Sequence, residues 1–543
     1  MHEMVRSKPR VFQTVARAVH EHGDTLFGVM GDANLFMVDH YVRGCGGRFV
    51  PATHEGSAVL MALAHAHVSG RPGIATITHG PALTNCVMAL TEGARGNVPM
   101  VLLAGDTPPS NPDHLQSIDQ EDVVQPTGCG FMQVRAPNTA ASDVARAFYR
   151  ARVERRPIVL DIPADFMWQE DDESPRVLEV FETPAFVPEG ETVERAIGMI
   201  ASAKRPLILA GAGAIDAPEQ LIRLADRLEA PLATTLKAKG LFRGHPYDMD
   251  LFGTLSTPAA YEAIARADCL VCFGASLNQF TADKGSLTEG KRIVQIDMDR
   301  RAIGRYVHPD AVLIADAALT ADNIVHWLDE AEIPASGFTH ELDPAALRLH
   351  PVPRGDARSG YVNYVWALTE LEKALPEDRL LVTDGGRFMT EVWCRISVPD
   401  PRSFVNTCNF GSIGLGMPEA IGASLAAPGR PLALFAGDGG FMMGGLNEFN
   451  TAVRLGQDMI VIVCNDSAYG AEHIQFRDRN MDPSLTQFTW PSFAAVATAL
   501  GGQGIEVRSA AELEQAIKCL KTRARPVLID LRIDPNDVPR MRI

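Results

Sequence analysis

One stretch of the chain decides its fold class: PLALFAGDGGFMMGGLNEFNTAVRLGQDMIVIVCNDSAYG, residues 431–470. It has the pattern of an apolar strand, a glycine-rich turn, a helix and a second apolar strand that ends at Asp466. Glycines surround Asp438 at the end of the first strand, where they let a backbone approach a phosphate group. Because parallel strands joined by a helix end at the same edge of a sheet, we expect the two carboxylates to face one crevice.

This pair of strand ends predicts a magnesium site. Mg²⁺ prefers six oxygen ligands in octahedral order and often shares them with phosphates. We therefore expect Mg²⁺ to bridge a diphosphate to the protein at Asp438 and Asp466. The alternative interpretation makes GDGG an ordinary loop and Asp466 a turn residue. The helix and the apolar strand between the two positions favour the metal site.

The alternation of short apolar runs and helical stretches continues outward over the whole chain. It divides into three blocks, at residues 1–175, 188–335 and 358–543, which an acidic proline-containing connector and a second proline-rich connector join. Strands that alternate with helices are typical of parallel sheets covered on both faces. The predicted fold class is therefore α/β, with three doubly wound parallel-sheet domains.

Composition narrows the classes of function. The chain has 543 residues, 46% of them hydrophobic, and a formal net charge of -17, which argues against a nucleic-acid partner. No window approaches the roughly 20 apolar residues of a membrane span, and the N-terminus lacks an apolar signal core, so a cytoplasmic enzyme is expected. Cys269 and Cys272 form a CxxC inside an apolar run, which predicts a buried strand and no metal or redox site.

Segment 431–470 is similar to the thiamine-diphosphate signature, in which an asparagine pair follows GDG after roughly 30 residues. The resemblance extends over nearly the whole chain and points to the group of acetolactate synthase, pyruvate decarboxylase and benzoylformate decarboxylase. It implies pyrimidine-binding, central and diphosphate-binding domains, in that order. It also implies that Asp438, Asp466 and the carbonyl of Ala468 bind Mg²⁺. The family usually has asparagine where this chain has Asp466, which is an equally hard ligand with one more negative charge.

The same resemblance implies further cofactor contacts in four loops. These are Asp384, Gly386 and Arg387 in TDGGRF, Gly411 and Ile413 in NFGSIGLG, Gly437, Gly439 and Gly440 around Asp438, and Tyr469 and Gly470 after Ala468. The family uses a residue like Ile413 as a wedge that bends the cofactor, although an ordinary helix-start loop is the alternative. Arg387 is unusual at its place, and we expect it to pair with a phosphate or a substrate carboxylate.

Glu55 follows an apolar strand and opens an alanine-rich helix. The family places its activating glutamate here, where the carboxyl group bonds the pyrimidine ring of the cofactor. That chemistry needs a carboxyl group partly withdrawn from water. The alternative is charge complementarity, because glutamate is favoured at a helix start in any case. The metal motif downstream favours catalysis.

Six other residues are candidates for proton transfer and substrate recognition. They are Asp32 in GDANLFMVD, His79 in THGPALTN, His114, Gln120 in SIDQEDVV, and Glu472 and His473 after the metal motif. Asp32 and Glu472 match acidic positions of the decarboxylases, whereas THGPALTN and Gln120 match active-site elements of the synthases. Each of these residues alone is equally consistent with an exposed or helix-capping polar side chain.

Two loops resemble other nucleotide sites only in part. GAGAID, residues 211–216, lacks the third glycine of a dinucleotide fingerprint. GASLNQFT, residues 274–281, has Ser276 where the synthases have a flavin-contacting arginine, so FAD is not expected. GSLTEGKR has Arg292 where a phosphate-binding loop needs serine or threonine, so a P-loop is excluded.

The sequence therefore predicts an enzyme that cleaves or joins C–C bonds next to a carbonyl with thiamine diphosphate and Mg²⁺. A 2-oxo acid decarboxylase or carboligase is the main prediction. An acetolactate-synthase-like transferase is the nearer alternative, and a non-catalytic cofactor-binding homologue the more remote one. The expected partners are a small 2-oxo acid, a second carbonyl compound, and further copies of the chain. The family's shared active sites imply a homodimer or a homotetramer.

Overall fold

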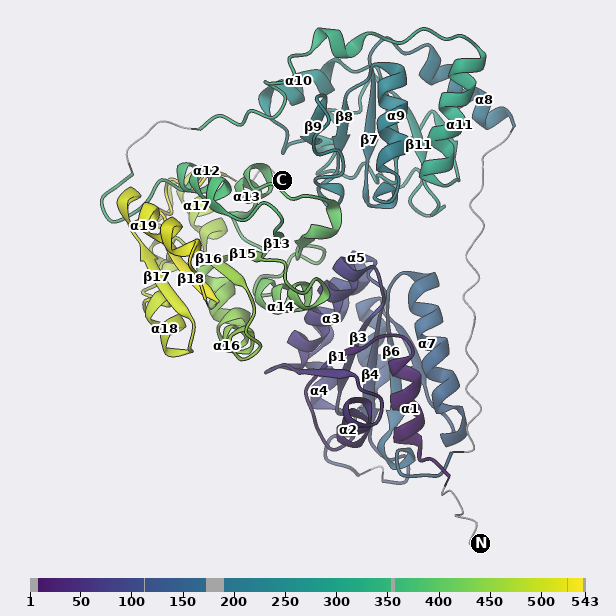
Figure 1. The fold of residues 1–543 in the computed structure, drawn as a ribbon, viewed down its shortest axis with the longest axis vertical. Coiled ribbons are helices and arrows are strands. Elements are labelled where there is room, and N and C mark those ends of the chain that lie inside the picture. Colours follow the sequence, from purple (N-terminus) through teal and green to yellow (C-terminus); the bar gives the residue numbers. More distant parts are fainter. Residues whose placement is uncertain (1–7, 112, 172–189, 353–356, 525, 541–543) are drawn as a thin grey trace.

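The computed structural model describes residues 8–111, 113–171, 190–352, 357–524 and 526–540. They form three lobes that follow one another along the chain, from purple through teal to yellow (Figure 1). Each lobe is built on a six-stranded sheet in which every strand pair is parallel. The three parallel-sheet domains predicted from the alternating pattern are confirmed. The connector expected after residue 175 lies outside the described residues.

The N-terminal sheet has the strand order β2-β1-β3-β4-β6-β5. Its strands are β1 Thr25–Gly28, β2 Arg48–Pro51, β3 Gly73–Ile77, β4 Met100–Asp106, β5 Gly130–Gln133 and β6 Pro157–Pro163. Its helices are α1 Val11–His20, α2 Leu35–Arg43, α3 Glu55–Ser69, α4 Pro81–Thr84, α5 Val87–Gly96, α6 Gln120–Val124 and α7 Ala140–Glu154. Strand β6 is buried along its whole length, as expected for a sheet covered on both faces.

The central sheet has the order β12-β11-β10-β7-β8-β9. Its strands are β7 Pro206–Ala210, β8 Leu232–Thr234, β9 Asp248–Leu251, β10 Cys269–Phe273, β11 Arg292–Ile296 and β12 Ala311–Leu313. Its helices are α8 Glu191–Ala201, α9 Pro218–Leu228, α10 Pro258–Arg266 and α11 Ala317–Glu330. Strand β10 is fully buried and carries Cys269 and Cys272, which confirms the buried strand expected for this CxxC.

The C-terminal sheet has the order β14-β13-β15-β16-β18-β17. Its strands are β13 Leu380–Thr383, β14 Phe404–Asn406, β15 Leu432–Gly437, β16 Met459–Asn465, β17 Gln503–Val507 and β18 Val527–Arg532. Its helices are α12 Tyr364–Ala374, α13 Met389–Arg395, α14 Gly416–Ala426, α15 Asp438–Gly440, α16 Leu446–Arg454, α17 Gly470–Asp478, α18 Phe493–Ala499 and α19 Ala510–Leu520. A π-helical turn, Phe441–Gly445, joins α15 to α16.

Each sheet is wound in two directions from its first strand. In the N-terminal sheet, β1 lies between β2 and β3, so the chain adds β2 on one side of β1 and then crosses to add β3 on the other. In the C-terminal sheet, β13 lies between β14 and β15 in the same way. In the central sheet the reversal lies between β7 and β10. Ligands of doubly wound sheets bind outside the carboxyl ends of the strands at this reversal. The topology therefore marks one candidate position in each domain.

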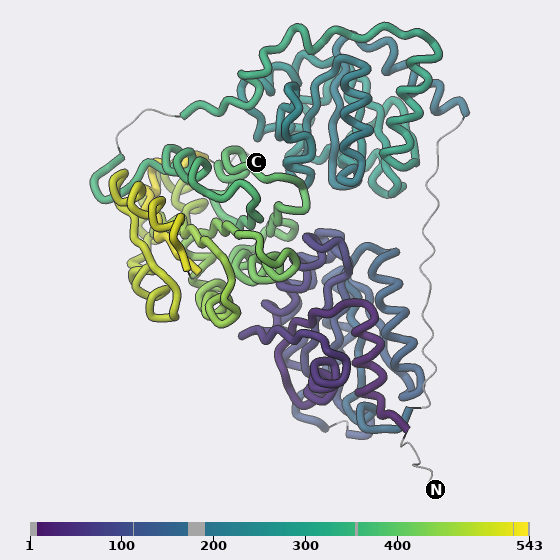
Figure 2. The backbone as a smooth tube through the Cα atoms, viewed as in Figure 1, coloured from purple at the N-terminus to yellow at the C-terminus, as the bar shows by residue number. Residues whose placement is uncertain are grey.

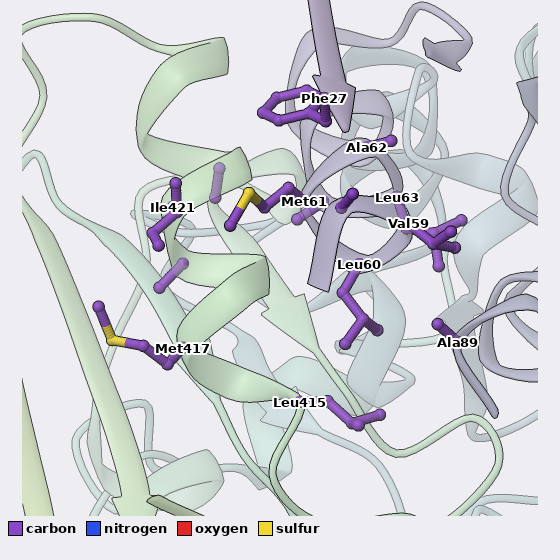
Figure 3. Packing of buried hydrophobic residues seen from close by; sticks show 14 of the residues in the cluster. Phe27, Val59, Leu60, Met61, Ala62, Leu63, Ala89, Leu415, Met417 and Ile421 are labelled. Atoms are coloured by element: carbon purple, nitrogen blue, oxygen red, sulfur yellow. The ribbon is translucent and has the colours of Figure 1, made fainter. Parts of the chain in front are cut away.

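The N-terminal and C-terminal domains share a hydrophobic core. Helices α3 and α14 pack against each other, and Met61 and Ile421 lie between them (Figure 3). A Cβ atom at Gly422 would lie 2.0 Å from the carbonyl oxygen of Met61, so the two backbones approach closely only because this residue is glycine. The lobes coloured purple and green meet at this crossing in the tube view (Figure 2).

The segment after residue 335, expected to be a connector, packs partly on the central domain. Phe338 and Leu347 are buried in the core of that domain. The hydroxyl of Thr257 donates a hydrogen bond of 2.8 Å to the carbonyl of Leu347. Among the described residues, no helix has the length and apolar character that crossing a membrane requires.

Candidate active site

Two buried carboxylates lie at the carboxyl ends of neighbouring strands in the C-terminal sheet. Strands β15 and β16 are paired in parallel, with Gly437 opposite Cys464. Asp438 directly follows β15, and Asp466 directly follows β16. Both side chains are buried. The parallel-sheet argument from the sequence thus brings together the two predicted metal ligands.

The charges of this pair are poorly compensated by the protein. Burial raises the pKa of Asp438, and burial together with the neighbouring Asp438 raises the pKa of Asp466. The indole Nε1 of Trp490 donates a hydrogen bond of 2.7 Å to Asp438 Oδ2. Two adjacent buried carboxylates fit a divalent cation, which would offset both charges at once.

The loop after Asp466 is shaped around its carboxylate. The backbone N–H of Ala468 donates to Asp466 Oδ1 at 3.1 Å, and a Cβ atom on Gly470 would lie 2.5 Å from Asp466 Oδ2. Among the described residues, no group of three or more His, Cys, Asp or Glu side chains is arranged to hold a metal. The site would therefore complete its coordination with backbone, water or diphosphate oxygens, as Mg²⁺ commonly does.

Asp384 lies at the reversal of the C-terminal sheet, just after β13. Its carboxylate accepts backbone hydrogen bonds from Gly385, Gly414 and Leu415. Burial raises the pKa of Asp384 to about 6, although these N–H groups act in the opposite direction. A Cβ atom on Gly440 would lie 2.7 Å from Asp384 Oδ2. Asp384 thus joins the loop before α14 to the glycine turn after β15.

The predicted wedge residue, Ile413, is half-buried in that loop. Gly411 and Gly414 flank it with φ values of 85° and 83°, a left-handed conformation that favours glycine. A Cβ atom on Gly444 would lie 2.1 Å from the carbonyl oxygen of Gly414. The loop therefore fits tightly against the π-helical turn, a feature often found at functional sites. On the other side, Gly437 ends β15, and Gly439 and Gly440 belong to the short helix α15.

Arg387 has different partners from those expected from the sequence. Its guanidinium group is buried and donates to the backbone carbonyls of Pro535, Val538 and Pro539. These bonds tie Arg387 to the C-terminal segment of the chain, and the expected phosphate or substrate-carboxylate partner stays a prediction. Gly386, its neighbour, has a φ of 148°.

Glu55 is the first residue of α3, and its side chain is half-buried. The helix start is capped by His54, whose Nδ1 accepts a hydrogen bond of 3.1 Å from the N–H of Gly56. Asn85 Nδ2 donates to Glu55 Oε2 at 2.9 Å. Asn85 ends the turn that begins at Thr78, so this hydrogen bond links Glu55 to the predicted substrate turn.

Asp32, His79 and His114 come together at the reversal of the N-terminal sheet, between the ends of β1 and β3. Thr78 Oγ1 donates to Asp32 Oδ1 at 2.8 Å, and His79 Nε2 lies 3.5 Å from the same oxygen. The rings of His79 and His114 are 5.1 Å apart in an edge-on arrangement. Partial burial would raise the pKa of Asp32, but Thr78 and His79 outweigh it and lower that pKa.

The three side chains differ in exposure. His79 is buried, and its Nδ1 has no hydrogen-bond partner in the part of the chain that the structure describes. The Asp32 side chain is 71% exposed, and His114 is half-buried. One orphaned polar atom beside an exposed carboxylate suits a site that receives a polar ligand.

Gln120 is buried beneath this cluster. Its Oε1 accepts a hydrogen bond from the N–H of Gly80, and its Nε2 donates to the carbonyl of Gly105 and to Asp161 Oδ1. Both ends of the amide are therefore engaged with the protein. Its hydrogen bond from Gly80 holds the turn at that residue, and the catalytic role expected from the sequence stays a prediction.

The residues after the metal motif have two different surroundings. Glu472 is exposed in the first turn of α17. His473 is buried between Thr486 Oγ1 at 3.1 Å and Asn536 Oδ1 at 3.2 Å, which makes it a support for the C-terminal segment. The Tyr469 ring is half-exposed and packs edge-on against Phe488, with centroids 4.5 Å apart.

Sequence reasoning missed two residues that touch the predicted site. Trp490 bonds Asp438, and Glu92 bonds the loop that carries Gly411 and Ile413. Both belong to apolar or helical stretches without a recognisable motif. Glu92 is 317 residues away in sequence from its partner Asn409, so no local pattern could have linked them.

Comparison with known proteins agrees with this geometry. Three descriptions match in order: "Thiamine pyrophosphate enzyme, N-terminal TPP binding domain" at residues 9–123, the central domain of the same family at 193–324, and its C-terminal TPP binding domain at 384–531. Sulfoacetaldehyde acetyltransferase from Alcaligenes xylosoxydans xylosoxydans is 30% identical over 93% of this chain and 89% of its own length. The chain belongs to the thiamine pyrophosphate enzyme family.

Other relatives in this family carry different activities in their names. Acetolactate synthase isozyme 1 large subunit from Escherichia coli is 26% identical over 94% of this chain and 91% of its own length. A probable 2-ketoarginine decarboxylase from Pseudomonas aeruginosa is 26% identical over 96% of this chain and 93% of its own length. The thiamine pyrophosphate enzyme described here therefore belongs to the synthase, decarboxylase and acetyltransferase group.

Proposed function

We propose that the chain is a Mg²⁺- and thiamine-diphosphate-dependent 2-oxo acid decarboxylase or carboligase. The observation that carries this proposal is the Asp32–His79–His114 cluster at the reversal of the N-terminal sheet. A reaction that removes carbon dioxide and then protonates the remaining carbon needs groups that can move protons. A half-exposed histidine, a buried histidine and a carboxylate supply such groups at one place.

In this proposal, each residue has a role that follows from its position in the fold. When bound, thiamine diphosphate supplies the electron sink for the bond that breaks next to the carbonyl. Asp438, Asp466 and the Ala468 carbonyl would hold Mg²⁺ and the diphosphate, and Ile413 would support the rings. Glu55 would share a proton with the pyrimidine N1′, held in place by its hydrogen bond from Asn85.

In this proposal, the substrate meets one hydrogen-bond donor, His79, and one acceptor, Asp32. The buried Nδ1 of His79 can donate to a carboxylate once the ring rotates or is protonated. Asp32, whose pKa is lowered, is ionised at neutral pH and would accept a proton or orient His79. Glu472 would donate a proton after carbon dioxide leaves, because its position six residues after Asp466 matches the second glutamate of the decarboxylases.

A transferase like acetolactate synthase is the second candidate. Gln120 fixes Gly80 in the turn that resembles the synthases, and relatives with synthase and acetyltransferase names match nearly the whole chain. In that reaction a second carbonyl compound takes the place of the proton. The two candidates share every step up to the loss of carbon dioxide.

We also propose that each active site lies between two copies of the chain, in a homodimer or homotetramer. The carboxylate of Glu55 is bonded within its own domain, to Asn85, and both residues are accessible from outside. The metal ligands belong to the C-terminal domain. A second chain would bring its C-terminal domain against this exposed edge.

Turnover of a panel of 2-oxo acids, with and without an aldehyde or a second 2-oxo acid, tests the proposal. The panel should vary in side-chain charge and size. A decarboxylase releases carbon dioxide and an aldehyde without an acceptor, whereas a transferase gives a condensed product and is slow without one. No carbon dioxide from any member, in the presence of cofactor and Mg²⁺, would refute both candidates.

A further inference from the structure

Helix α5 of the N-terminal domain forms hydrogen bonds with the loop at Asn409 and Phe410, which belongs to the C-terminal domain of the same chain. Glu92 Oε1 accepts hydrogen bonds from the backbone N–H of Asn409 at 2.8 Å and from Asn409 Nδ2 at 2.7 Å. Glu92 Oε2 accepts a hydrogen bond of 2.6 Å from the N–H of Phe410. The glutamate is buried, with only 2% of its surface exposed. One side chain thus binds three N–H groups of two consecutive residues.

These three contacts suit only a carboxylate. Every partner is a donor, and both oxygens of Glu92 accept. A glutamine of the same shape would point an N–H group at another N–H group and lose at least one bond. Charge-assisted hydrogen bonds of this kind are roughly twice as strong as neutral ones. Glu92 is therefore chemically matched to the loop.

Two further residues of α5 contact the same loop. The guanidinium carbon of Arg95 lies 4.6 Å from the centroid of the Phe410 ring, within cation–π range. A Cβ atom on Gly96 would lie 3.1 Å from Asn409 Nδ2, so a larger residue there would crowd the loop. The end of α5 is thus shaped to hold Asn409 and Phe410.

The loop that Glu92 binds continues directly to Ile413, the predicted wedge residue under the cofactor. Gly411 and Ile413 follow Phe410, and Gly414 and Leu415 are bound by Asp384 at the far end. The segment 409–415 is therefore fastened by two buried carboxylates, Glu92 from one domain and Asp384 from the other. Residues 411–413 lie between the two fastened ends, and Gly411 among them has a left-handed φ of 85°.

We propose that Glu92 is a positioning residue that sets the conformation of the cofactor loop from the N-terminal domain of the same chain. This inference rests on the proposed function, because the loop is assigned to thiamine diphosphate there. Glu92 does not touch the reacting atoms. It acts by fixing the entrance of the loop, so that Ile413 and the Gly411 carbonyl are held in place before the cofactor binds.

The test compares Glu92→Gln with a matched control, Glu419→Gln, in the full chain. Glu419 is a buried carboxyl group on α14 in the same neighbourhood, and it makes none of the three loop hydrogen bonds. Burial, with Glu92 and Asp384 nearby, raises the pKa of Glu419. Asn409→Ala is a milder variant that removes one of the three bonds and serves if Glu92→Gln fails to fold.

Two measurements decide the outcome. Amide hydrogen exchange of residues 409–413 in cofactor-free protein should be roughly tenfold faster in Glu92→Gln and unchanged in Glu419→Gln. The Kd for thiamine diphosphate at saturating Mg²⁺ should rise roughly 10- to 100-fold in Glu92→Gln. The near-ultraviolet circular-dichroism band of the bound cofactor should change as well. Asn409→Ala should show the same effects, several-fold smaller.

Equal exchange in Glu92→Gln and the parent, or an equal loss of affinity in Glu419→Gln, would overturn the inference. If the parent itself does not bind thiamine diphosphate, the proposed function fails. The exchange measurement then still decides whether Glu92 orders the loop, since it is made without cofactor. The two failures are thereby distinguishable.

Discussion

The two terminal sheets and the central sheet have the same winding but differ at the point where it reverses. In the N-terminal sheet, Asp32 and His79 lie at this point. In the C-terminal sheet, Asp384 lies there, beside Gly440 in the glycine-rich segment after β15. In the central sheet the corresponding turns begin with Gly211 and Gly274, and no charged side chain lies within the first five residues of either turn.

The central turns contact each other through their backbones. Gly213 N donates to the carbonyl of Gly274 at 3.2 Å, and a Cβ atom on Gly211 would lie 2.2 Å from that oxygen. The space between the two strand ends is therefore taken by the protein itself. This contact, together with Ser276, supports the expectation that FAD does not bind, which stays a prediction.

The comparison shows that one architecture can carry a site or omit it, depending on the residues after its strands. In the two terminal domains, charged and hydrogen-bonding side chains lie at the reversal. At the same place in the central domain the two turns pack backbone against backbone, so no cofactor is expected there.

The largest expected effect is that Asp438→Ala abolishes stabilisation by thiamine diphosphate and Mg²⁺. A ligand at about 100 times its Kd stabilises the folded state by about 2.7 kcal/mol, which is read as a rise in the melting temperature. The variant should show no such rise because it lacks a predicted metal ligand.

Asp297→Ala is the matched control for this experiment. Asp297 follows β11 at the carboxyl edge of the central sheet, where no cofactor is expected. It should keep the full cofactor-dependent rise in melting temperature. A normal rise in Asp438→Ala, or a loss in Asp297→Ala, would contradict the division between terminal and central sheets.

The next effect separates the two glutamates of the terminal domains. Glu472→Gln should bind cofactor normally but turn over roughly 10²- to 10⁴-fold more slowly, the usual cost of removing one positioned acid. Glu55→Gln should instead slow the exchange of the cofactor C2 proton with solvent, which NMR of quenched samples measures. A Glu472 variant that loses C2 exchange, or turns over like the parent, would show that its role is different.

Mixed oligomers test whether the terminal domains of different chains meet. Glu55→Gln and Asp438→Ala are each expected to be inactive alone. After subunit exchange, a shared site gives one intact site in every mixed dimer, or about a quarter of the parental activity in an equal random mixture. Mixed dimers isolated with two affinity tags that remain inactive would rule out the shared site.

The last prediction concerns a buried carboxyl group of the central domain, Asp248. Burial and the neighbouring Asp250 raise the pKa of Asp248 to about 6. Because the folded state holds this proton more tightly than the unfolded state, stability falls as pH rises from about 4 to about 6, by on the order of 2–3 kcal/mol. Above that range the contribution is constant.

Asp248→Asn should remove this slope. Urea-unfolding midpoints of parent and variant, measured from pH 4 to 7, should shift in favour of the variant as pH rises. Cofactor-dependent stabilisation should not change, since Asp248 lies in the domain without a predicted site. A pH-independent difference between the two proteins would mean that Asp248 is not the group responsible.

Much of the architecture could be predicted from the sequence because it depends on local patterns. Buried runs such as those of β10 and β16 are continuous in sequence and bounded by aspartate or glycine, so they indicate strands directly. The meeting of Asp438 with Asp466 follows from the rule that parallel strands end at one edge. The meeting of Asp32 with His79 follows from the same rule in the first sheet.

The remainder could not be predicted because it depends on contacts between distant segments. Arg387 looked like a phosphate ligand, yet its partners are carbonyls about 150 residues away, of which Pro535 is 148 residues distant. Gln120 and His473 are polar residues in motif-like places, but the fold turns them inward as supports. Glu92 has no motif at all, and only the packing of α5 against the C-terminal domain reveals its partners.

The central claim is that the terminal domains hold thiamine diphosphate and Mg²⁺ to release carbon dioxide from a 2-oxo acid. The most direct measurement is carbon dioxide release after both are removed by chelation and dialysis, and then added back singly and together. We expect no release without them, little with either alone, and full recovery with both. Release that persists after complete removal, or none after full restoration with any 2-oxo acid of the panel, would contradict the account.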